Sequence, residues 1–293
     1  MSDRRENIRW GAEQRLEFIE FRLFWEGGVN RGDLTEQFGV SVPQASADLS
    51  LYRELEPDNI AYDATEKKYV PGAAFNPKFY SPNADRYLAQ LRAISDGILR
   101  RDDVWMEFMP SVDAMPIPQK RVDANVLSNL LRAYREKRAV EITYQSMSRT
   151  RPDQTKRRIT PHSFFFDGMR WYVRAYCHLS GDFRSFSLSR CYAAENISDS
   201  SVSSDDDKQW STKIIVTLAP NPLLSSTQQK SIAEDYCMTD GRLIFSVREA
   251  LLIFFNTRLR LDVPLDDSKP NKTPLVVVNR IEYDAVLNRL EVA

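Results

Sequence analysis

The middle of the sequence combines arginine and aromatic residues at a spacing suited to binding an anion. The run Arg170–Cys177 reads RWYVRAYC. Alternate side chains of a strand share a face, so one face would carry Arg170, Tyr172, Arg174 and Tyr176. Guanidinium groups pair with phosphates through two parallel hydrogen bonds, and aromatic rings stack on nucleobases. The pattern therefore predicts a site for a phosphate-bearing ligand with a stackable base.

A second arginine run and the distribution of charge support the same interpretation. Arg184, Phe186, Leu188 and Arg190 would lie in line on a later strand. The whole chain has a net charge of −1, but residues 119–190 hold 15 Lys/Arg against 6 Asp/Glu. This basic block in an otherwise acidic protein predicts an anionic partner. The alternative, a solvated cationic sheet face with no ligand, stays open.

The N-terminal residues show the pattern of a helix-turn-helix. A helix is predicted over Arg9–Trp25, ending at Gly27-Gly28, and Asn30 can cap a second helix that runs to Phe38. Gly39 suits a left-handed helix end, and Ser41 can cap a third helix from Val42 to about Leu55. Residues 60–62 and 67–70 then flank a polar turn and predict a two-stranded wing.

In such an arrangement the third helix enters the major groove of DNA. Gln44 could pair with adenine through two hydrogen bonds, while basic side chains hold phosphates. The acidic balance of residues 1–80, 10 Lys/Arg against 14 Asp/Glu, counts against DNA binding, and a small helical core without DNA is the alternative. The candidate DNA-binding residues are Arg31, Ser41, Pro43, Gln44, Ser46, Ala47, Arg53, Lys67 and Lys68.

Breaks in composition divide the chain into parts. Residues 72–82 are rich in Gly and Pro, residues 109–119 are rich in Pro, and residues 198–207 are polar and acidic. We expect a winged helix over 1–80, a helical linker over 81–118, a central domain over 119–200 and a C-terminal domain over 208–293. In the central part, a helix is predicted over 126–134, followed by five short strands over 139–144, 157–160, 163–166, 170–177 and 183–188. This order predicts a strongly bent sheet or partly open barrel.

The C-terminal part alternates strands and helices. Strands are predicted over 213–218, 243–247 and 275–279, and helices over 227–237 and 250–259. This alternation predicts a small α/β sandwich, which we assign to dimerisation because it carries no phosphate loop and no group of catalytic residues. The fold class expected for the whole chain is multidomain α+β.

Three motifs in order make the chain similar to a known family. The run RWYVRAYC resembles the signature of WYL-domain transcriptional regulators, with Val173 in place of the signature leucine, and the flanking segments Ile159–Ser163 and Phe183–Arg190 also match. With the helix-turn-helix before them, they resemble the WYL repressors found beside bacterial phage-defence operons. The resemblance implies a homodimer that binds an inverted-repeat operator on double-stranded DNA, and an Sm-like β-barrel that senses a nucleotide or nucleic-acid fragment. The implied ligand residues are Ser146, His162, Tyr172, Arg174, Arg184 and Arg190.

Two other classes of function remain. A basic barrel containing His162 and Tyr144 could be a nuclease or phosphodiesterase, although carboxylates for a metal are few and unevenly spaced and no catalytic motif is present. A sensor that signals to a protein partner would explain the acidic N-terminus. We expect no cofactor, no metal site and no membrane span. The three cysteines fit a reducing cytoplasm, each more as a small buried hydrophobe than as a ligand.

Overall fold

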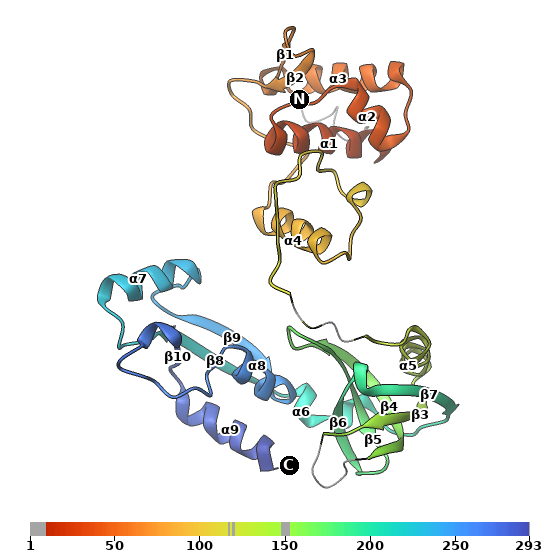
Figure 1. The fold of residues 1–293 in the computed structure, drawn as a ribbon, viewed down its shortest axis with the longest axis vertical. Coiled ribbons are helices and arrows are strands. Elements are labelled where there is room, and N and C mark those ends of the chain that lie inside the picture. Colours follow the sequence, from red (N-terminus) through yellow and green to blue (C-terminus); the bar gives the residue numbers. More distant parts are fainter. Residues whose placement is uncertain (1–9, 117, 119–120, 148–152, 293) are drawn as a thin grey trace. The chain divides into compact units, whose positions relative to one another are not determined.

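The computed structural model describes residues 10–292 apart from 117, 119–120 and 148–152 (Figure 1). The predicted helix start, Arg9, lies outside the described residues. Internal contacts divide the chain into two compact units, Met1–Pro116 and Ile117–Ala293, which we describe separately. No helix among the described residues is both long and apolar enough to cross a membrane.

The first unit begins with the predicted helix-turn-helix. Helices α1 (Trp10–Glu26), α2 (Arg31–Phe38) and α3 (Val42–Leu55) precede an antiparallel hairpin of β1 (Ile60–Asp63) and β2 (Lys68–Pro71). The Asn30 side chain accepts hydrogen bonds from the first-turn N–H groups of α2, and the Ser41 side chain accepts one from the Gln44 N–H. Gly39 has a φ of 63°, which favours glycine. The predicted helices, caps and wing are thus confirmed.

A buried carboxylate ties the segment after the wing to α1. Glu20 is fully buried and accepts hydrogen bonds from the Tyr52 hydroxyl and from the backbone N–H groups of residues 78, 79 and 80. Helix α4 (Ala84–Ser95) follows, and its Leu91 packs in one cluster with Phe21 of α1. Residues 81–106 therefore pack against the helix-turn-helix, although composition alone suggests a separate linker.

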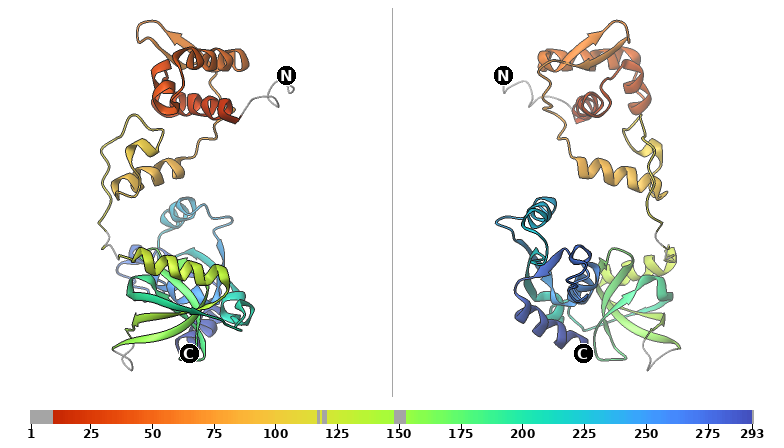
Figure 2. Two further views of the ribbon diagram at one scale, coloured as in Figure 1. Left: turned by 90° about the vertical axis from the view of Figure 1, so that its right-hand side faces the viewer. Right: turned by 60° about the vertical axis from the view of Figure 1, so that its left-hand side comes forward.

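The second unit begins with a helix and a five-stranded antiparallel sheet. Helix α5 (Ala124–Glu136) packs its apolar face, including Val126, Leu130 and Ala133, against the sheet (Figure 2). The strands have the order β6-β5-β4-β3-β7. Their bounds are β3 (Ala139–Gln145), β4 (Gln154–Phe166), β5 (Trp171–Cys177), β6 (Asp182–Ser187) and β7 (Cys191–Ser198).

Two of the strand predictions in this sheet are wrong. The predicted strands 157–160 and 163–166 are one long strand, β4, because a bulge between Pro161 and Ser163 lets it bend without ending. Strand β7 is absent from the prediction, yet it pairs with β3. Strands β6 and β7 are edges in the pairings of the described residues, so these strands do not form a closed barrel.

The C-terminal part contains a three-stranded antiparallel sheet with order β10-β8-β9. Val216, Leu218 and Leu252 form its core with Tyr283 and Leu287 of α9, a helix missing from the prediction. Cys177 and Cys191 are buried as expected, whereas Cys237 is exposed, which corrects the prediction for that residue. The elements are α6 (Lys208–Ser211), β8 (Lys213–Pro220), α7 (Ser226–Asp235), β9 (Leu243–Arg248), α8 (Leu252–Arg258), β10 (Leu275–Val277) and α9 (Arg280–Val292).

Candidate functional site

Helix α3 presents its N-terminal turns to the outside of the first unit. Ala45 and Leu49 are buried in the core, whereas Pro43, Gln44 and Ala47 are exposed. Ser41 is also exposed, and Ser46 is half-buried with its hydroxyl donating to the Val42 carbonyl. The helix therefore offers the predicted reading residues on one accessible side while its opposite side fixes its position.

A buried carboxylate, paired with Arg15, holds the amide of Gln44. Gln44 Nε2 donates to Asp48 Oδ1 at 3.1 Å, and Asp48 also receives Arg15 Nε at 2.7 Å and Arg15 Nη2 at 3.2 Å. A carboxylate only accepts hydrogen bonds, so the Gln44 NH₂ group must face Asp48. The Gln44 carbonyl oxygen and its second N–H stay available for a base edge. Sequence reasoning missed Asp48; its position four residues after Gln44 on a helix was the signal.

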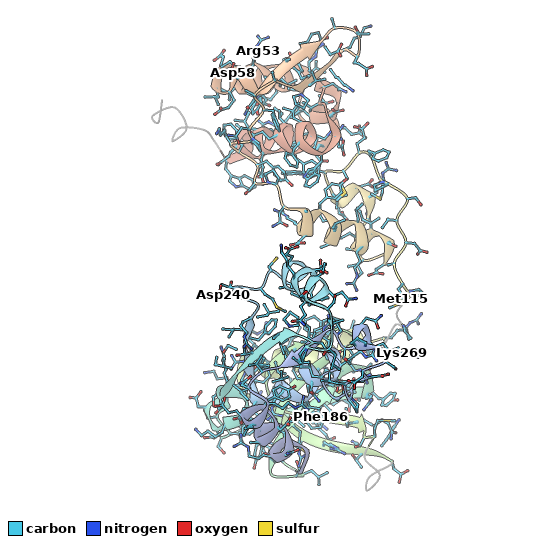
Figure 3. The ribbon with its side chains drawn as sticks, turned by 90° about the vertical axis from the view of Figure 1, so that its left-hand side faces the viewer. Arg53, Asp58, Met115, Phe186, Asp240 and Lys269 are labelled. Atoms are coloured by element: carbon cyan, nitrogen blue, oxygen red, sulfur yellow. The ribbon has the colours of Figure 1, made fainter. Side chains whose placement is uncertain are left out.

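The predicted phosphate-binding residues lie on α2, on α3 and in the wing. Arg31, Lys67 and Arg53 are exposed, the last near the C-terminal end of α3 (Figure 3). Lys68 is half-buried, and its Nζ lies 3.3 Å from a Glu66 carboxylate oxygen. The pair is accessible to water, so it holds Lys68 only weakly.

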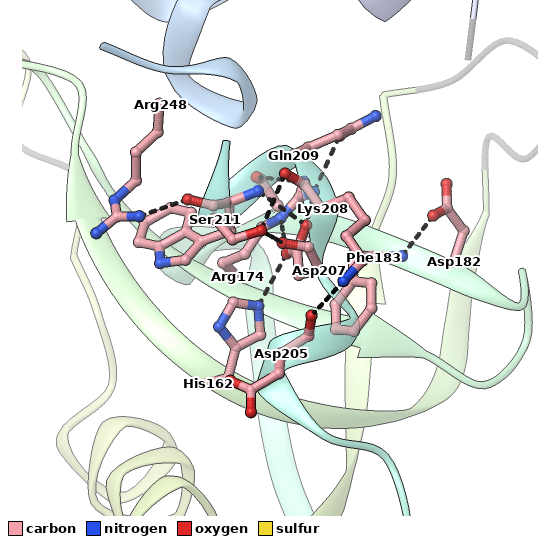
Figure 4. A network of polar contacts seen from close by, with 12 residues as sticks. His162, Arg174, Asp182, Phe183, Asp205, Asp207, Lys208, Gln209, Ser211 and Arg248 are labelled. Carbon is pink, nitrogen blue, oxygen red and sulfur yellow. Dashed lines mark hydrogen bonds and ion pairs between the residues drawn. The ribbon is translucent and has the colours of Figure 1, made fainter. Parts of the chain in front are cut away.

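In the second unit, the predicted ligand residue Arg174 is buried and already pairs with an anion. Its Nε lies 2.7 Å from Asp207 Oδ2 and its Nη2 lies 3.0 Å from Asp207 Oδ1, a two-bond contact (Figure 4). His162 Nε2 lies 3.0 Å from Asp207 Oδ2. Gln209 Oε1 accepts a further hydrogen bond from Arg174. The His162 side chain is 7% exposed.

The Asp207 carboxylate is held as an anion. Burial alone would raise its pKa, but the hydrogen bonds from His162 and Arg174 outweigh burial and lower that pKa to about 2. Its side chain is only 1% exposed. The two basic groups thus form a compact receptor for one carboxylate or for the oxygens of one phosphate.

Aromatic rings surround this anion-binding group. The Tyr172 ring stacks on Phe165 with ring centroids 4.9 Å apart, and both rings contact Phe254 of the C-terminal part. Burial and the nearby Asp167 carboxylate raise the pKa of Tyr172 to about 12. Trp210 of α6 lies edge-on to His162. The Phe165 and Phe254 rings thus cover part of the Tyr172 ring.

The other predicted ligand residues do not share the face of Arg174. Arg184 lies opposite Ala175 in the β5–β6 register, and paired residues share a face, so Arg184 belongs to the core side of the sheet. Because β6 is an edge strand, Arg184 still borders a groove with Arg174, of about 160 Å³. Arg190 lies after β6. Burial raises the pKa of Tyr144, and the positive charge of Arg190 offsets part of this rise. Ser146 is half-buried beyond the end of β3.

Sequence reasoning missed the residue at the centre of this network. Asp207 ends a polar segment that composition marks as a break between domains. Nothing in the local sequence distinguishes Asp207 from the other aspartates of this segment or signals that it is buried. Arg157 was missed too: its guanidinium lies 5.4 Å from the Tyr144 ring centre on the core side of the sheet. Among the described residues, no group of three His, Cys, Asp or Glu side chains could hold a metal ion.

Known proteins resemble this chain along nearly its whole length. A DNA-binding transcriptional repressor CapW from Escherichia coli (strain KTE188) is 39% identical over 285 residues, covering 97% of this chain and 95% of the relative. The chain belongs to the CapW family. Relatives of the same name from Pseudomonas aeruginosa (37% identity, 95% of this chain and 92% of the relative) and Stenotrophomonas maltophilia (35%, 94% and 92%) also match.

Three family models describe the parts of this CapW-family chain. The BrxR transcriptional regulator winged helix-turn-helix domain matches residues 11–93, the WYL domain matches 125–195, and the BrxR C-terminal dimerization domain matches 213–283. The resemblance expected from the RWYVRAYC motif and its flanking segments is therefore confirmed. The relatives are named as repressors rather than as enzymes.

Proposed function

We propose that this CapW-family protein is a homodimeric transcriptional repressor that reads operator DNA with α3, and that it acts in the cytoplasm. The observation that carries the proposal is the presentation of α3: Pro43, Gln44 and Ala47 are exposed while Ala45 and Leu49 fix the helix. Arg31, Arg53, Lys67 and Lys68 would contact phosphates, with Ser41 and Ser46 near the groove edge. The wing β1–β2 would lie along the DNA backbone.

The second copy would bind to the C-terminal sheet. Ile215 and Ile244 are 52% and 65% exposed, and they lie on the face of β8 and β9 opposite the core residues Val216 and Val247. Exposed aliphatic side chains on one sheet face mark an interaction surface. Two-fold pairing through this face would give two α3 helices and hence an inverted-repeat operator.

The central domain would serve as the sensor. The helix-then-five-strands order supports a bent, Sm-like sheet, with β3 between β4 and the last strand β7. Arg174 and His162 would bind a phosphate of a nucleotide or short oligonucleotide, with Tyr172, Arg184, Arg190 and Ser146 at neighbouring positions. We propose the division DNA binding over 1–80, linker over 81–118, sensor over 119–200 and dimerisation over 208–293, in which residues 81–106 of the linker pack against the helix-turn-helix.

The test is selection of DNA from a random library by the full-length protein, followed by fluorescence anisotropy on the selected sequence. We expect an inverted repeat with half-sites separated by about one helical turn, 10–10.5 base pairs, or a multiple of it. Affinity should fall steeply as salt rises, because several Lys and Arg side chains release counterions.

The double variant Lys67→Ala/Arg53→Ala should weaken binding to all sequences and reduce the salt dependence. A matched control is Lys230→Ala/Arg289→Ala, which removes the same two charges from the C-terminal domain. Selection that yields no enriched sequence, or equal effects of the two double variants, would contradict DNA reading by α3 and the wing.

A further inference from the structure

We infer that Asp207 is an internal competitor for the effector's phosphate: its carboxylate occupies the receptor of Arg174 and His162, and effector binding expels it. This inference rests on the proposed sensor function and adds the regulation of that site. It makes the polar segment before α6 a switch rather than a passive connection.

The contacts of Asp207 are those expected of a bound phosphate. Arg174 meets both carboxylate oxygens, and His162 meets one of them. A planar guanidinium fork is the protein group best suited to two-bond contact with carboxylate or phosphate. The Asp207 carboxylate takes the Nε–Nη2 edge of the Arg174 guanidinium together with the His162 ring nitrogen. A phosphate that is to contact both Arg174 at this edge and His162 must therefore replace the carboxylate.

The segment that carries Asp207 is held weakly enough to move. None of residues 199–206 is buried, and Asp205 and Asp206 are exposed. Its contacts with the sheet are polar, such as Ser200 Oγ to Thr160 Oγ1 at 2.8 Å and Asp199 Oδ1 to Arg138 Nε at 3.2 Å. Segments with few buried apolar contacts open at low free-energy cost.

The space beside Arg174 also favours displacement. The groove bordered by Arg174, Arg184 and Gln209 holds about 160 Å³. Binding sites for small organic ligands usually measure about 300–1,000 Å³. A nucleotide therefore needs more room than the groove gives, and departure of Asp207 with the start of α6 would supply it.

Departure of Asp207 would be transmitted to the C-terminal domain. The Asp207 side chain accepts from the Trp210 N–H and so caps α6. The Trp210 ring lies under the Arg248 guanidinium of β9, 5.0 Å from its centre, and Arg248 also donates to the Trp210 carbonyl. Glu249 N–H donates to the Thr212 carbonyl at 3.0 Å. A change at Asp207 thus reaches β9, next to the proposed dimer face.

The experiment compares the wild type, Asp207→Asn and the matched control Asp205→Asn, all full length. The probes are thymidine 5′-monophosphate and thymidine, which differ only by the phosphate. If Asp207 occupies the receptor in 90–99% of molecules, its removal should tighten binding of the phosphorylated probe about 10- to 100-fold. Asp205→Asn should stay within about twofold of the wild type, because its side chain is exposed.

A second measurement uses the wild type alone, so it holds even if Asp207→Asn does not fold. Hydrogen–deuterium exchange of residues 199–211 should become faster when the phosphorylated probe binds, since the segment leaves the receptor. Slower exchange in this segment on binding would overturn the inference. Binding of the phosphorylated probe by folded Asp207→Asn with unchanged or lower affinity would overturn it too.

The outcomes separate the inference from the proposed sensor. If neither the wild type nor Asp207→Asn distinguishes the phosphorylated probe from the unphosphorylated one, the phosphate-sensing function fails and the competitor with it. If the wild type prefers the phosphorylated probe but Asp207→Asn gains nothing, the sensor stands and only the competitor role fails.

Discussion

Replacement of Gln44 by alanine tests base reading most directly. The Gln44 amide is exposed, and Asp48 orients it so that its carbonyl oxygen and one N–H can meet the edge of adenine. A two-bond contact of this kind contributes about 1–3 kcal/mol of discrimination, which is about 5- to 150-fold for one half-site. Because a dimer carries two copies, an operator altered in only one half-site gives the clean value.

The fold should tolerate this change. Asp48 keeps both hydrogen bonds from Arg15, so we expect Gln44→Ala to alter the free energy of unfolding by less than about 1 kcal/mol. Anisotropy titrations would compare the selected operator with versions substituted at each base pair of one half-site. The wild type should lose affinity at one position at which the variant no longer discriminates. Gln90→Ala, on α4 outside the helix-turn-helix, is the matched control.

Equal loss of affinity on the operator and on scrambled DNA would refute the assignment of Gln44 as a base reader. The companion variant Asp48→Asn should partly relax discrimination at the same base pair, because an asparagine can no longer force the Gln44 NH₂ group inward. Relaxation at a different position would show that Asp48 acts on another residue.

Three further predictions concern stability and assembly. Glu20→Gln should lower the free energy of unfolding by about 2–4 kcal/mol in urea titrations, because the oxygen that accepts from three backbone N–H groups is replaced by an NH₂ group that cannot accept. The control Glu13→Gln, on the exposed side of α1, should change the stability little, and equal effects of the two variants would contradict this reasoning. Because the pKa of Asp207 is lowered from 3.8 to about 2, its stabilisation of about 2 kcal/mol is present above pH 3.8 and is lost as the pH falls through 2. The stability difference between the wild type and Asp207→Asn should therefore shrink between pH 5 and pH 2, and a constant difference would disprove it. Ile244→Glu should shift sedimentation toward the monomer and weaken operator binding, while Ile98→Glu, at an isoleucine of the first unit that is 74% exposed, should do neither. A dimer that survives Ile244→Glu would exclude this face.

Local signals account for how much of the fold could be predicted. Caps, glycines and apolar spacing act between residues a few positions apart, so the sequence predicts α2 and α3 with Asn30, Gly39 and Ser41 in their places. The RWYVRAYC run likewise determines a strand with Val173 and Ala175 toward the core. The family resemblance follows from the same local motifs.

Strand pairing and the partners of charged residues depend on contacts between distant parts of the chain. No local pattern shows that β4 continues through its bulge, or that β7 pairs with β3 across about 50 residues. The register of β5 and β6 likewise decides that Arg184 faces away from Arg174, although both arginines fit one alternating pattern in the sequence.

The sequence by itself determined the helix-turn-helix, the position of Gln44 in the first turn of its third helix and the basic, arginine-rich strand, because each depends on spacing between residues close together in the chain. Only the tertiary structure decided which anion that strand holds. Asp207 lies 33 residues from Arg174 in an acidic segment whose composition suggests solvent exposure, yet its carboxylate is buried against the guanidinium. The physical reason is that a buried charge is stable only beside its opposite, and the chain brings the two together through folding rather than through sequence proximity.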